Sequence, residues 1–445
     1  MAEPEESGSE NEPEATPLLA PHDGVPELAV SASEIKRAAE FLDSGEGPFA
    51  VDAERASGFR YSNRAYLLQI RRAGAGTVLI DPVNHGSDPV ATLAPIAEVL
   101  ATDEWVLHAA DQDLPCLAEI GMRPTSLYDT ELAGRLAGYD KVNLAAMVQR
   151  LLGLQLMKGH GAADWSQRPL PPEWLNYAAL DVEVLLDLRH AIAAVLDEQG
   201  KSDWAAQEFE YLRTYEAMPT RRDRWRRTSG IHKIRDGRAL AAVRELWTTR
   251  DHIAARRDIA PGRILPDAAI INAATTDPDT VEKLTALPVF GGSRQRRMAQ
   301  VWLDALARAR TTDDPPTSQE PSTGPPPASR WARRKPEAAA RLEAARSGIT
   351  KLSQRISVPT ENIVTPEIVR RLCWDWQPLQ TTEETAEAID KFLGEAKVRQ
   401  WQRELAVPVL TEALTADGEL GALPSQAGSP PREQTQNLPD TPDEG

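Results

Sequence analysis

Asp52 and Glu54, one residue apart in the segment PFAVDAER, are the first side chains whose type and spacing could do chemistry. On a β-strand alternate side chains share a face, so these two carboxylates project together while Phe49, Val51 and Ala53 face the core. Adjacent carboxylates repel each other unless protons or a cation lie between them. Taken alone, the pair more often marks a solvated strand face near a turn than a reactive site.

Tyr177 and Asp181 form a second candidate pair, in the segment EWLNYAALDVEVLLDL. Residues four apart lie on one face of a helix, and Val184, Leu185 and Leu188 make that face apolar enough to pack on a sheet. A buried, unpaired carboxylate costs free energy, so Asp181 should meet a cation there. A surface Asp beside a core Tyr is the alternative for this segment.

Asp113 is a third candidate, in HAADQDLPCL, one turn into a helix that follows a strand ending at His108. These residues also have ordinary structural explanations. Asp111 suits the N-cap of that helix, and Asp113 suits a partner for the positive end of the helix dipole. Taken singly, none of the three segments therefore predicts a reactive site, and only their order along the chain can.

The elements that must position these side chains lie in residues 31–212. Apolar runs of strand length occur at 48–54, 65–72, 77–82 and 105–109, and helix-like stretches occur at 90–101, 111–120, 129–136, 143–152 and 172–198. Three strands followed by helix, strand and helices predict an α/β domain with a mixed sheet.

Two further blocks, 213–310 and 330–414, show helical periodicity only and predict two small all-α modules. In the second block we expect one long helix at 330–355 and a last helix near 395–414. The similar layouts suggest a diverged duplication. Segments rich in Pro, acidic and small residues are expected to be disordered: an arm at 1–30, a linker at 311–329 and a tail at 415–445.

The charge divides along the same boundaries. The whole chain carries a net charge of −17, but residues 213–310 hold 20 Lys and Arg against 11 Asp and Glu, whereas residues 31–212 hold 15 against 27. Cys116 and Cys373 are the two cysteines, which excludes a disulfide framework and a Cys-ligated zinc site. With neither a membrane-spanning apolar run nor a signal-peptide pattern, we expect a soluble, cytoplasmic protein that does not enter a membrane.

Basic side chains within residues 213–310 could hold a polyanion. Arginines bridge phosphates and an aromatic ring can stack on a base, which makes one stretch a candidate nucleic-acid contact: Arg221, Arg222, Arg224, Trp225, Arg226 and Arg227. A second candidate group follows Gly291 and Gly292 at the start of a helix: Arg294, Arg296 and Arg297. A solvated linker and a simple turn between helices are the respective alternatives.

The three acidic segments occur in the order and at the distances of one known family. The chain resembles the DEDD exonucleases of the ribonuclease-H-like fold, in their Tyr-containing subgroup, and within these the ribonuclease D family. The run DWSQRPL before YAALD supports the resemblance, which covers roughly residues 45–200. The basic segment RWRRTSGIHKIRDGRALAAVRELWTTRDHIAARRDIAPGRILPD resembles the HRDC module of the same proteins, and residues 330–414 resemble it more weakly.

The resemblance implies a role for each matching residue. Asp52, Glu54, Asp113 and Asp181 would hold two divalent cations, Mg²⁺ or Mn²⁺, whose preferred ligands are oxygens. Tyr177 would orient the water that attacks the terminal phosphodiester.

Neighbouring residues are less specific. His108 either contacts the substrate or simply ends its strand. We expect Asp129 to cap a helix rather than bind metal, and Asp164 and Arg168 to pair with each other.

The implied activity is 3′→5′ hydrolysis of RNA to nucleoside 5′-monophosphates, with tRNA precursors or other structured RNA as substrates and the protein as a monomer. A 3′→5′ DNA exonuclease is the alternative within the class, because related DNA enzymes share the motifs. A nucleic-acid-binding scaffold with a degenerate site is the alternative from another class. The intact set of four carboxylates and Tyr177 argues against the scaffold.

Overall fold

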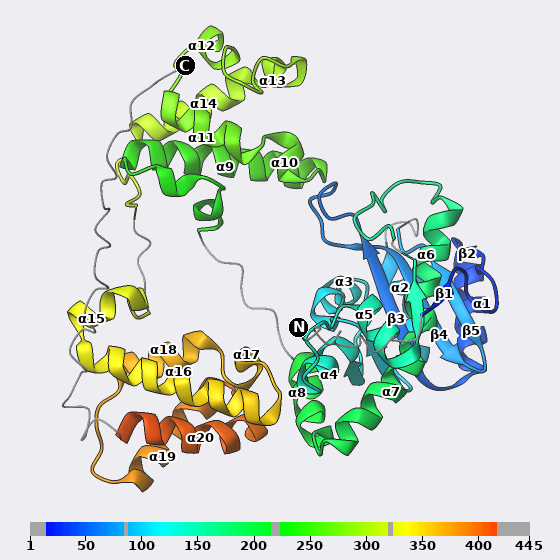
Figure 1. The fold of residues 1–445 in the computed structure, drawn as a ribbon. Coiled ribbons are helices and arrows are strands. Elements are labelled where there is room, and N and C mark those ends of the chain that lie inside the picture. The colour runs from blue at the N-terminus through cyan, green and yellow to red at the C-terminus, as the bar shows by residue number, and fades with distance from the viewer. Residues whose placement is uncertain (1–14, 84–87, 158, 215–222, 319–323, 416–445) are drawn as a thin grey trace, which may run out of the picture.

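The computed structural model describes residues 15–83, 88–157, 159–214, 223–318 and 324–415 (Figure 1). It comprises an N-terminal α/β domain and two helical modules, joined by a linker. The predictions made for residues 1–14 and 416–445, and those for Arg221 and Arg222, lie outside the described residues.

The α/β domain is built on a mixed six-stranded sheet in the order β2-β5-β4-β3-β6-β7. Its long strand β3 pairs antiparallel with β4 and parallel with β6, so it occupies the middle of the sheet. The predicted mixed sheet is confirmed. The strands are β1 (Thr16–Leu18), β2 (Leu28–Ala29), β3 (Glu46–Arg55), β4 (Ala65–Ala73), β5 (Gly76–Ile80), β6 (Glu104–Leu107), β7 (Ser126–Asp129) and β8 (Leu154–Leu156).

Helices cover both faces of this sheet. On one face, α1, α2 and α3 share a core with Phe49, Val51 and Ala53, the predicted inward residues of β3. The stretch expected to be one helix at 172–198 is two helices, which meet at Val184. The helices are α1 (Ala32–Asp43), α2 (Pro89–Leu100), α3 (Leu114–Glu119), α4 (Thr130–Leu136), α5 (Leu144–Leu152), α6 (Pro172–Glu183), α7 (Leu185–Glu198) and α8 (Ser202–Thr214).

Residues 15–30 correct the prediction of a disordered arm over 1–30. β1 pairs with β8 and β2 pairs with β5, both in parallel. Leu18 and Ala29 are buried, and the His22 ring lies 2.8 Å from the Glu183 carboxylate. This segment is ordered by partners distant in the sequence, which its own acidic composition does not reveal.

The first helical module contains α9 (Gly237–Arg257), α10 (Pro261–Ile264), α11 (Asp267–Thr276), α12 (Val281–Thr285), α13 (Ser293–Arg297) and α14 (Ala299–Thr311), after short 3₁₀ turns at Arg224–Arg227 and Ile231–Lys233. The second contains α15 (Trp331–Arg334), α16 (Pro336–Ile356), α17 (Thr360–Ile363), α18 (Pro366–Asp375), α19 (Thr382–Glu395) and α20 (Gln400–Thr415). Within the described part of the chain, every helix is too short or too polar to cross a membrane.

The two modules repeat one layout. Helices α16, α17 and α18 correspond in order to α9, α10 and α11. Each begins and ends 99 residues after its counterpart; for example, α16 begins at Pro336 and α9 begins at Gly237. This register supports the suggested duplication. The helix expected at 330–355 is divided at Lys335, because the residue before a proline disfavours helical geometry.

Each module rests on the α/β domain. Asp258, at the end of α9, accepts hydrogen bonds from the Ser62 backbone N–H (2.8 Å) and the Tyr66 hydroxyl (3.3 Å). In the second module, the Trp401 indole donates to Glu208 of α8 at 2.8 Å and its ring stacks on Trp204.

Candidate active site

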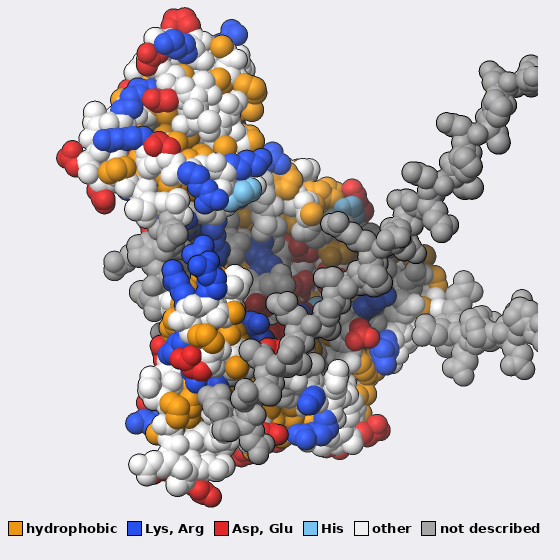
Figure 2. All heavy atoms as spheres, turned by 60° about the vertical axis from the view of Figure 1, so that its left-hand side comes forward, with side chains coloured by type: hydrophobic (Ala, Val, Ile, Leu, Met, Phe, Trp, Pro, Cys, Tyr) orange, Lys and Arg blue, Asp and Glu red, His pale blue; other side chains and the backbone are white. Residues whose placement is uncertain are grey.

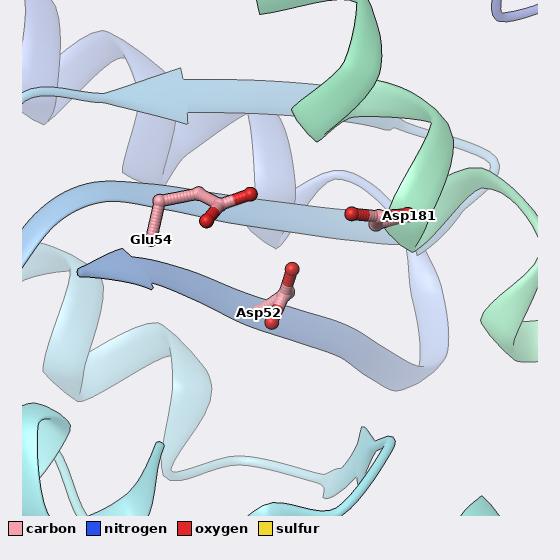
Figure 3. A group of neighbouring side chains, drawn as sticks. All are labelled: Asp52, Glu54 and Asp181. Atoms are coloured by element: carbon pink, nitrogen blue, oxygen red, sulfur yellow. The ribbon is translucent and has the colours of Figure 1, made fainter. Parts of the chain in front are cut away.

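Strand β3 and helix α6 bring three carboxylates together. Asp52, Glu54 and Asp181 each offer an oxygen, and these atoms lie within 4.8 Å of one another (Figure 3). Asp52 and Glu54 share one face of β3 because one residue separates them, as predicted. Asp181 projects from the α6 face that packs on the sheet, where Ala178 and Val182 are buried.

Asp113 belongs to the same site and forms an ion pair with Arg55. It lies at the N-terminal end of α3, and its carboxylate is 2.8 Å from the Arg55 guanidinium. The register of β3 against β4 shifts between Glu54 and Arg55, and such an irregularity re-aims the side chain that follows it. Sequence reasoning missed Arg55, since strict alternation would have turned it away from Glu54.

Tyr177 lies one helical turn before Asp181 and completes the predicted group. Its ring is T-shaped to His160 at 5.9 Å and tilted to Trp165 at 6.5 Å. The Tyr177 hydroxyl and the Asp181 carboxyl lie near enough to shift each other's pKa. The phenol is therefore held by surrounding rings with its oxygen beside the carboxylates.

One cavity of about 430 Å³ contains all five of these residues in its wall: Asp52, Glu54, Asp113, Tyr177 and Asp181. Three segments that are far apart in the sequence thus contribute to a single concave site.

The carboxylates in this cavity perturb one another. Burial, and then the neighbouring charge of Asp52, raises the pKa of Glu54 to about 9. Burial also raises the pKa of Asp113 to about 8, although the Arg55 guanidinium opposes the shift. The pKa values of Asp52 and Asp181 are raised chiefly by burial. Without a cation in the cavity, Glu54 and Asp113 therefore hold protons at neutral pH.

The donor set fits hard divalent cations. Within the described residues, no ion pair joins Asp52, Glu54 or Asp181 to a basic side chain, since Arg55 is engaged by Asp113. The available ligands are carboxylate oxygens, which Mg²⁺ and Mn²⁺ prefer. A cation would also relieve the repulsion that raises the pKa of Glu54.

His108 lies in the cavity wall, where its Nδ1 is 2.9 Å from the Thr130 hydroxyl. Burial lowers the pKa of His108 to about 4, so the ring is neutral at pH 7. It can exchange hydrogen bonds with a ligand but brings no charge to a phosphate.

Asp129 caps α4, as expected, and also holds the backbone before Asp113. Its carboxylate accepts backbone N–H bonds from Glu131 (2.9 Å) and Leu132 (3.0 Å) in α4. It also accepts from Ala109 (3.2 Å) and Ala110 (2.8 Å), at the end of β6. Ala109 has a φ of 60°, a strained conformation for a residue with a side chain.

Arg168 does not pair with Asp164, contrary to our prediction. Its guanidinium binds both carboxylate oxygens of Asp81, at 2.6 and 2.9 Å, and donates to three backbone carbonyls. Asp164 instead accepts from the Ser166 hydroxyl at 2.5 Å. The planar guanidinium of Arg168 favours a carboxylate that it can bind through two parallel hydrogen bonds. Asp81 lies 87 residues away in the sequence, so no local pattern predicts this pair.

The predicted base-stacking role of Trp225 is wrong. Trp225 is 4% exposed and belongs to the core of the first helical module. Arg226 lies over the Trp225 ring and contacts Asp223, and Arg224 lies over Trp247. Arg227 is exposed.

The other predicted arginine group remains at the surface. Arg296 and Arg297 are exposed, while Arg294 donates to the Arg263 carbonyl at 3.1 Å. None of these arginines lines the carboxylate cavity.

The sheet and the matching family models define the class of the chain. Residues 28–197 match a model described as 3'-5' exonuclease, and residues 239–306 match the HRDC domain. Residues 324–414 match a model described as 3' to 5' exonuclease C-terminal domain, so the second helical module matches a model other than HRDC. The chain is therefore a 3′–5′ exonuclease-type protein with a ribonuclease-H-like domain.

Individual relatives identify the family within this class. The chain is 31% identical over 311 residues to a ribonuclease D from Acidiphilium cryptum, covering 67% of this chain and 76% of that protein. It is 33% identical over 217 residues to a ribonuclease D from Nitrobacter hamburgensis, covering 47% of this chain but only 55% of that protein. The chain belongs to the ribonuclease D family.

Solved structures share the arrangement. A protein from Bifidobacterium adolescentis has a TM-score of 0.78 at 34% identity, covering 90% of this chain and all of that one. Ribonuclease D from Escherichia coli has a TM-score of 0.60 at 23% identity, covering 83% of this chain and 98% of that one, and shows the fold.

Proposed function

We propose that this protein is a metal-dependent 3′→5′ exoribonuclease that shortens RNA from its 3′ end. The observation that carries the proposal is the convergence of Asp52, Glu54 and Asp181 within 4.8 Å, with Asp113 and Tyr177 in the same cavity. The E. coli ribonuclease D structure is described as an exoribonuclease involved in structured RNA processing. We extend that substrate class, including tRNA precursors, to this chain.

Asp52, Glu54, Asp113 and Asp181 would hold two divalent ions, Mg²⁺ or Mn²⁺. Bound there, such ions supply positive charge to the phosphodiester and lower the pKa of the attacking water. The carboxylates keep those charges at fixed positions, and Arg55 fixes the direction of Asp113.

Tyr177 positions the nucleophile in this proposal. Burial, followed by the charge of Asp181, raises the pKa of its hydroxyl, which therefore stays protonated. A protonated phenol near Asp181 has lone pairs that can accept a hydrogen bond from water. It would orient that water toward the terminal phosphate without taking its proton.

The test uses 5′-labelled RNA with a single-stranded 3′ end, in Mn²⁺, with DNA of the same sequence alongside. We expect stepwise shortening from the 3′ end, release of nucleoside 5′-monophosphates and slower attack on DNA. Asp52→Asn should be at least about a hundredfold slower, because metal charge supplies several kcal/mol of transition-state stabilisation. Asp111→Asn, an exposed neighbour of Asp113, is the matched control and should keep its activity.

Three outcomes would contradict the proposal. Equal rates for wild type and Asp52→Asn would remove the carboxylate site from the reaction. DNA consumed with RNA spared would favour the repair-type DNA exonuclease. RNA bound but never shortened would favour a binding scaffold.

A further inference from the structure

Both helical modules begin with a short turn that pairs a buried Trp with arginines. In the first, residues 224–227 read Arg-Trp-Arg-Arg, and in the second, residues 330–334 read Arg-Trp-Ala-Arg-Arg. Trp225 is 4% exposed and Trp331 is fully buried. The aromatic rings are therefore anchors in the two cores, and what each turn presents to its surroundings is its arginines.

The second turn is firmly held in place. The Trp331 ring packs on Trp374 with centroids 4.9 Å apart, and its indole N–H donates to the Pro326 carbonyl at 2.7 Å. The Lys335 ammonium donates to the Trp374 carbonyl at 2.6 Å. A turn fixed at both ends holds the side chains between them at defined positions.

The arginines of the two turns differ in what they contact. In the first turn, Arg226 is engaged by Asp223 and by the Thr317 carbonyl. In the second, Arg330, Arg333 and Arg334 are all exposed, and none of their guanidinium groups has a hydrogen bond or an ion pair among the described residues. The described segment from 324 to 335 contains four basic residues and no acidic one. Three unneutralised guanidinium groups therefore project from one short, anchored turn.

The location suits a long substrate. Helix α15 lies at the edge of the second module where the linker arrives from the first (Figure 1). Figure 2 turns this side of the molecule forward and shows Lys and Arg side chains gathered where the two modules approach each other. A long RNA with its 3′ end in the carboxylate cavity would extend beyond that cavity and could lie along a helical module that is docked on the α/β domain.

We propose that Arg330, Arg333 and Arg334 form a contact surface for the phosphate backbone of structured RNA. This inference rests on the proposed function for its ligand. Guanidinium groups bind phosphate oxygens through paired hydrogen bonds, so three of them suit a run of phosphates. Trp331 is buried and cannot stack on a base, so the surface recognises backbone and not sequence.

The test compares two triple variants that remove equal charge from one module. Arg330→Gln, Arg333→Gln and Arg334→Gln together remove the proposed surface. Arg346→Gln, Lys351→Gln and Arg355→Gln together remove three exposed charges from α16. Both sets lie at exposed positions, so the fold should persist, which circular dichroism would verify.

The readouts are binding of a hairpin RNA with a 3′ tail across a salt series, and hydrolysis of a short oligonucleotide. The first variant should bind the hairpin at least about tenfold more weakly at low salt, and its plot of log affinity against log salt should be shallower by about 2. It should hydrolyse the short oligonucleotide at the wild-type rate. The α16 variant should stay within about threefold of wild type in affinity and keep its salt slope.

Wild-type affinity for the first variant, or equal losses in both, would overturn the inference in favour of diffuse charge. Failure of the proposed function is a separate result, because it would show as no hydrolysis of the short oligonucleotide by any of the proteins. The binding comparison would still decide the role of the turn.

Discussion

Four acidic side chains around one cavity make the metal-free protein sensitive to pH. The folded-state pKa values of Glu54 and Asp113 are raised to about 9 and about 8, above the usual values of 4.5 and 3.8. Between the usual and the raised values, the folded protein holds protons that the unfolded chain has released. Its stability therefore falls as pH rises through that window.

We predict that the melting temperature in a chelator falls from about pH 6 to about pH 9. Mn²⁺ should raise the melting temperature more at the higher pH, because the ionised carboxylates bind it. Glu54→Gln should flatten the chelator curve, since the group that releases the proton is gone. Differential scanning calorimetry measures each curve, and a rise with pH, or an unchanged slope in Glu54→Gln, would refute the account.

Gly159 determines how closely the chain approaches the Tyr177 ring. A Cβ at Gly159 would overlap Cδ2 and Cε2 of Tyr177 and come within 2.8 Å of its Cζ. A Cβ at Gly161 would meet only the Tyr177 hydroxyl oxygen, at 3.6 Å, which is ordinary contact. The Tyr177 ring, which would orient the water in the proposed function, thus packs against a backbone that tolerates no side chain at Gly159.

Gly159→Ala is predicted to lower kcat about tenfold with a smaller change in KM, because it displaces the phenol and not the substrate. Gly161→Ala, in the same loop, should stay near the wild-type rate. In a Tyr177→Ala background the Gly159 substitution should have little further effect. Steady-state kinetics on the four proteins tests this, and equal costs in both backgrounds would mean that Gly159 acts elsewhere.

At this scale the sequence predicted the acidic residues but not their partners. Asp52, Glu54, Tyr177 and Asp181 follow local periodicities that a sequence displays directly. The Asp113–Arg55 pair depends on a strand irregularity that no local pattern encodes.

Among the elements, Asp129 at the start of α4 links the ends of β6 and β7 next to the site. Asp129 receives four backbone N–H groups, two from α4 and two from the strained turn after β6. Burial raises the pKa of Asp129 to about 6 despite these donors. The same carboxylate therefore caps a helix and aims the backbone that leads to Asp113.

Asp129→Ala should destabilise the protein by about 1–3 kcal/mol and lower activity at limiting Mn²⁺, since it leaves buried donors unpaired. Asp88→Ala removes the N-cap of α2, whose side chain accepts from Ala91 at 3.0 Å. This control should cost about 1 kcal/mol without altering the Mn²⁺ requirement. Urea denaturation and a Mn²⁺ titration of activity provide the comparison. An unchanged Mn²⁺ requirement in Asp129→Ala would show that Asp129 only caps α4 and does not position the metal site.

Element types were more predictable than element boundaries. The period-2 and period-3.6 patterns identified the sheet and the helical modules, while the break at Val184 carries no Gly or Pro signal. The break before Pro336 could have been predicted, because proline restricts the residue that precedes it.

Across the whole molecule, one carboxylate links the HRDC module to the segment that follows β3. Asp258 binds Ser62, Tyr66 and Arg64, the last at 3.3 Å. Arg263 adds a hydrogen bond to the Gly58 carbonyl at 2.8 Å. The loop therefore couples the position of the module to β3.

Asp258→Ala should loosen this docking and widen the distance distribution between labels on the two domains. Asp277→Ala is a matched control, because Asp277 has the same φ of 48° at the end of α11 but pairs with Arg310 inside the module. Hydrolysis of short oligonucleotides should survive both changes, while structured RNA should be processed more slowly by Asp258→Ala alone. Single-molecule energy transfer reports the distances, and identical distributions would contradict the docking role.

The order of the domains and the repetition of the helical module could be predicted from composition and helical periodicity. The contacts that dock each module on the α/β domain could not. The contacts of Asp258 join residues more than 190 positions apart, and those of Glu208 join α8 to the second module. Such pairings depend on the folded shape, which local patterns do not contain.

The most direct test of the central claim is single-turnover release of a 3′-terminal labelled nucleotide, with protein in excess over RNA. In Mn²⁺ the wild-type protein should release labelled nucleoside 5′-monophosphate, and a chelator should stop it. Asp181→Asn should bind the RNA yet release the label at least about a hundredfold more slowly. Release at the wild-type rate by Asp181→Asn, or label appearing first in 3′-terminal oligonucleotides longer than one nucleotide, would contradict a 3′→5′ exonuclease built on these carboxylates.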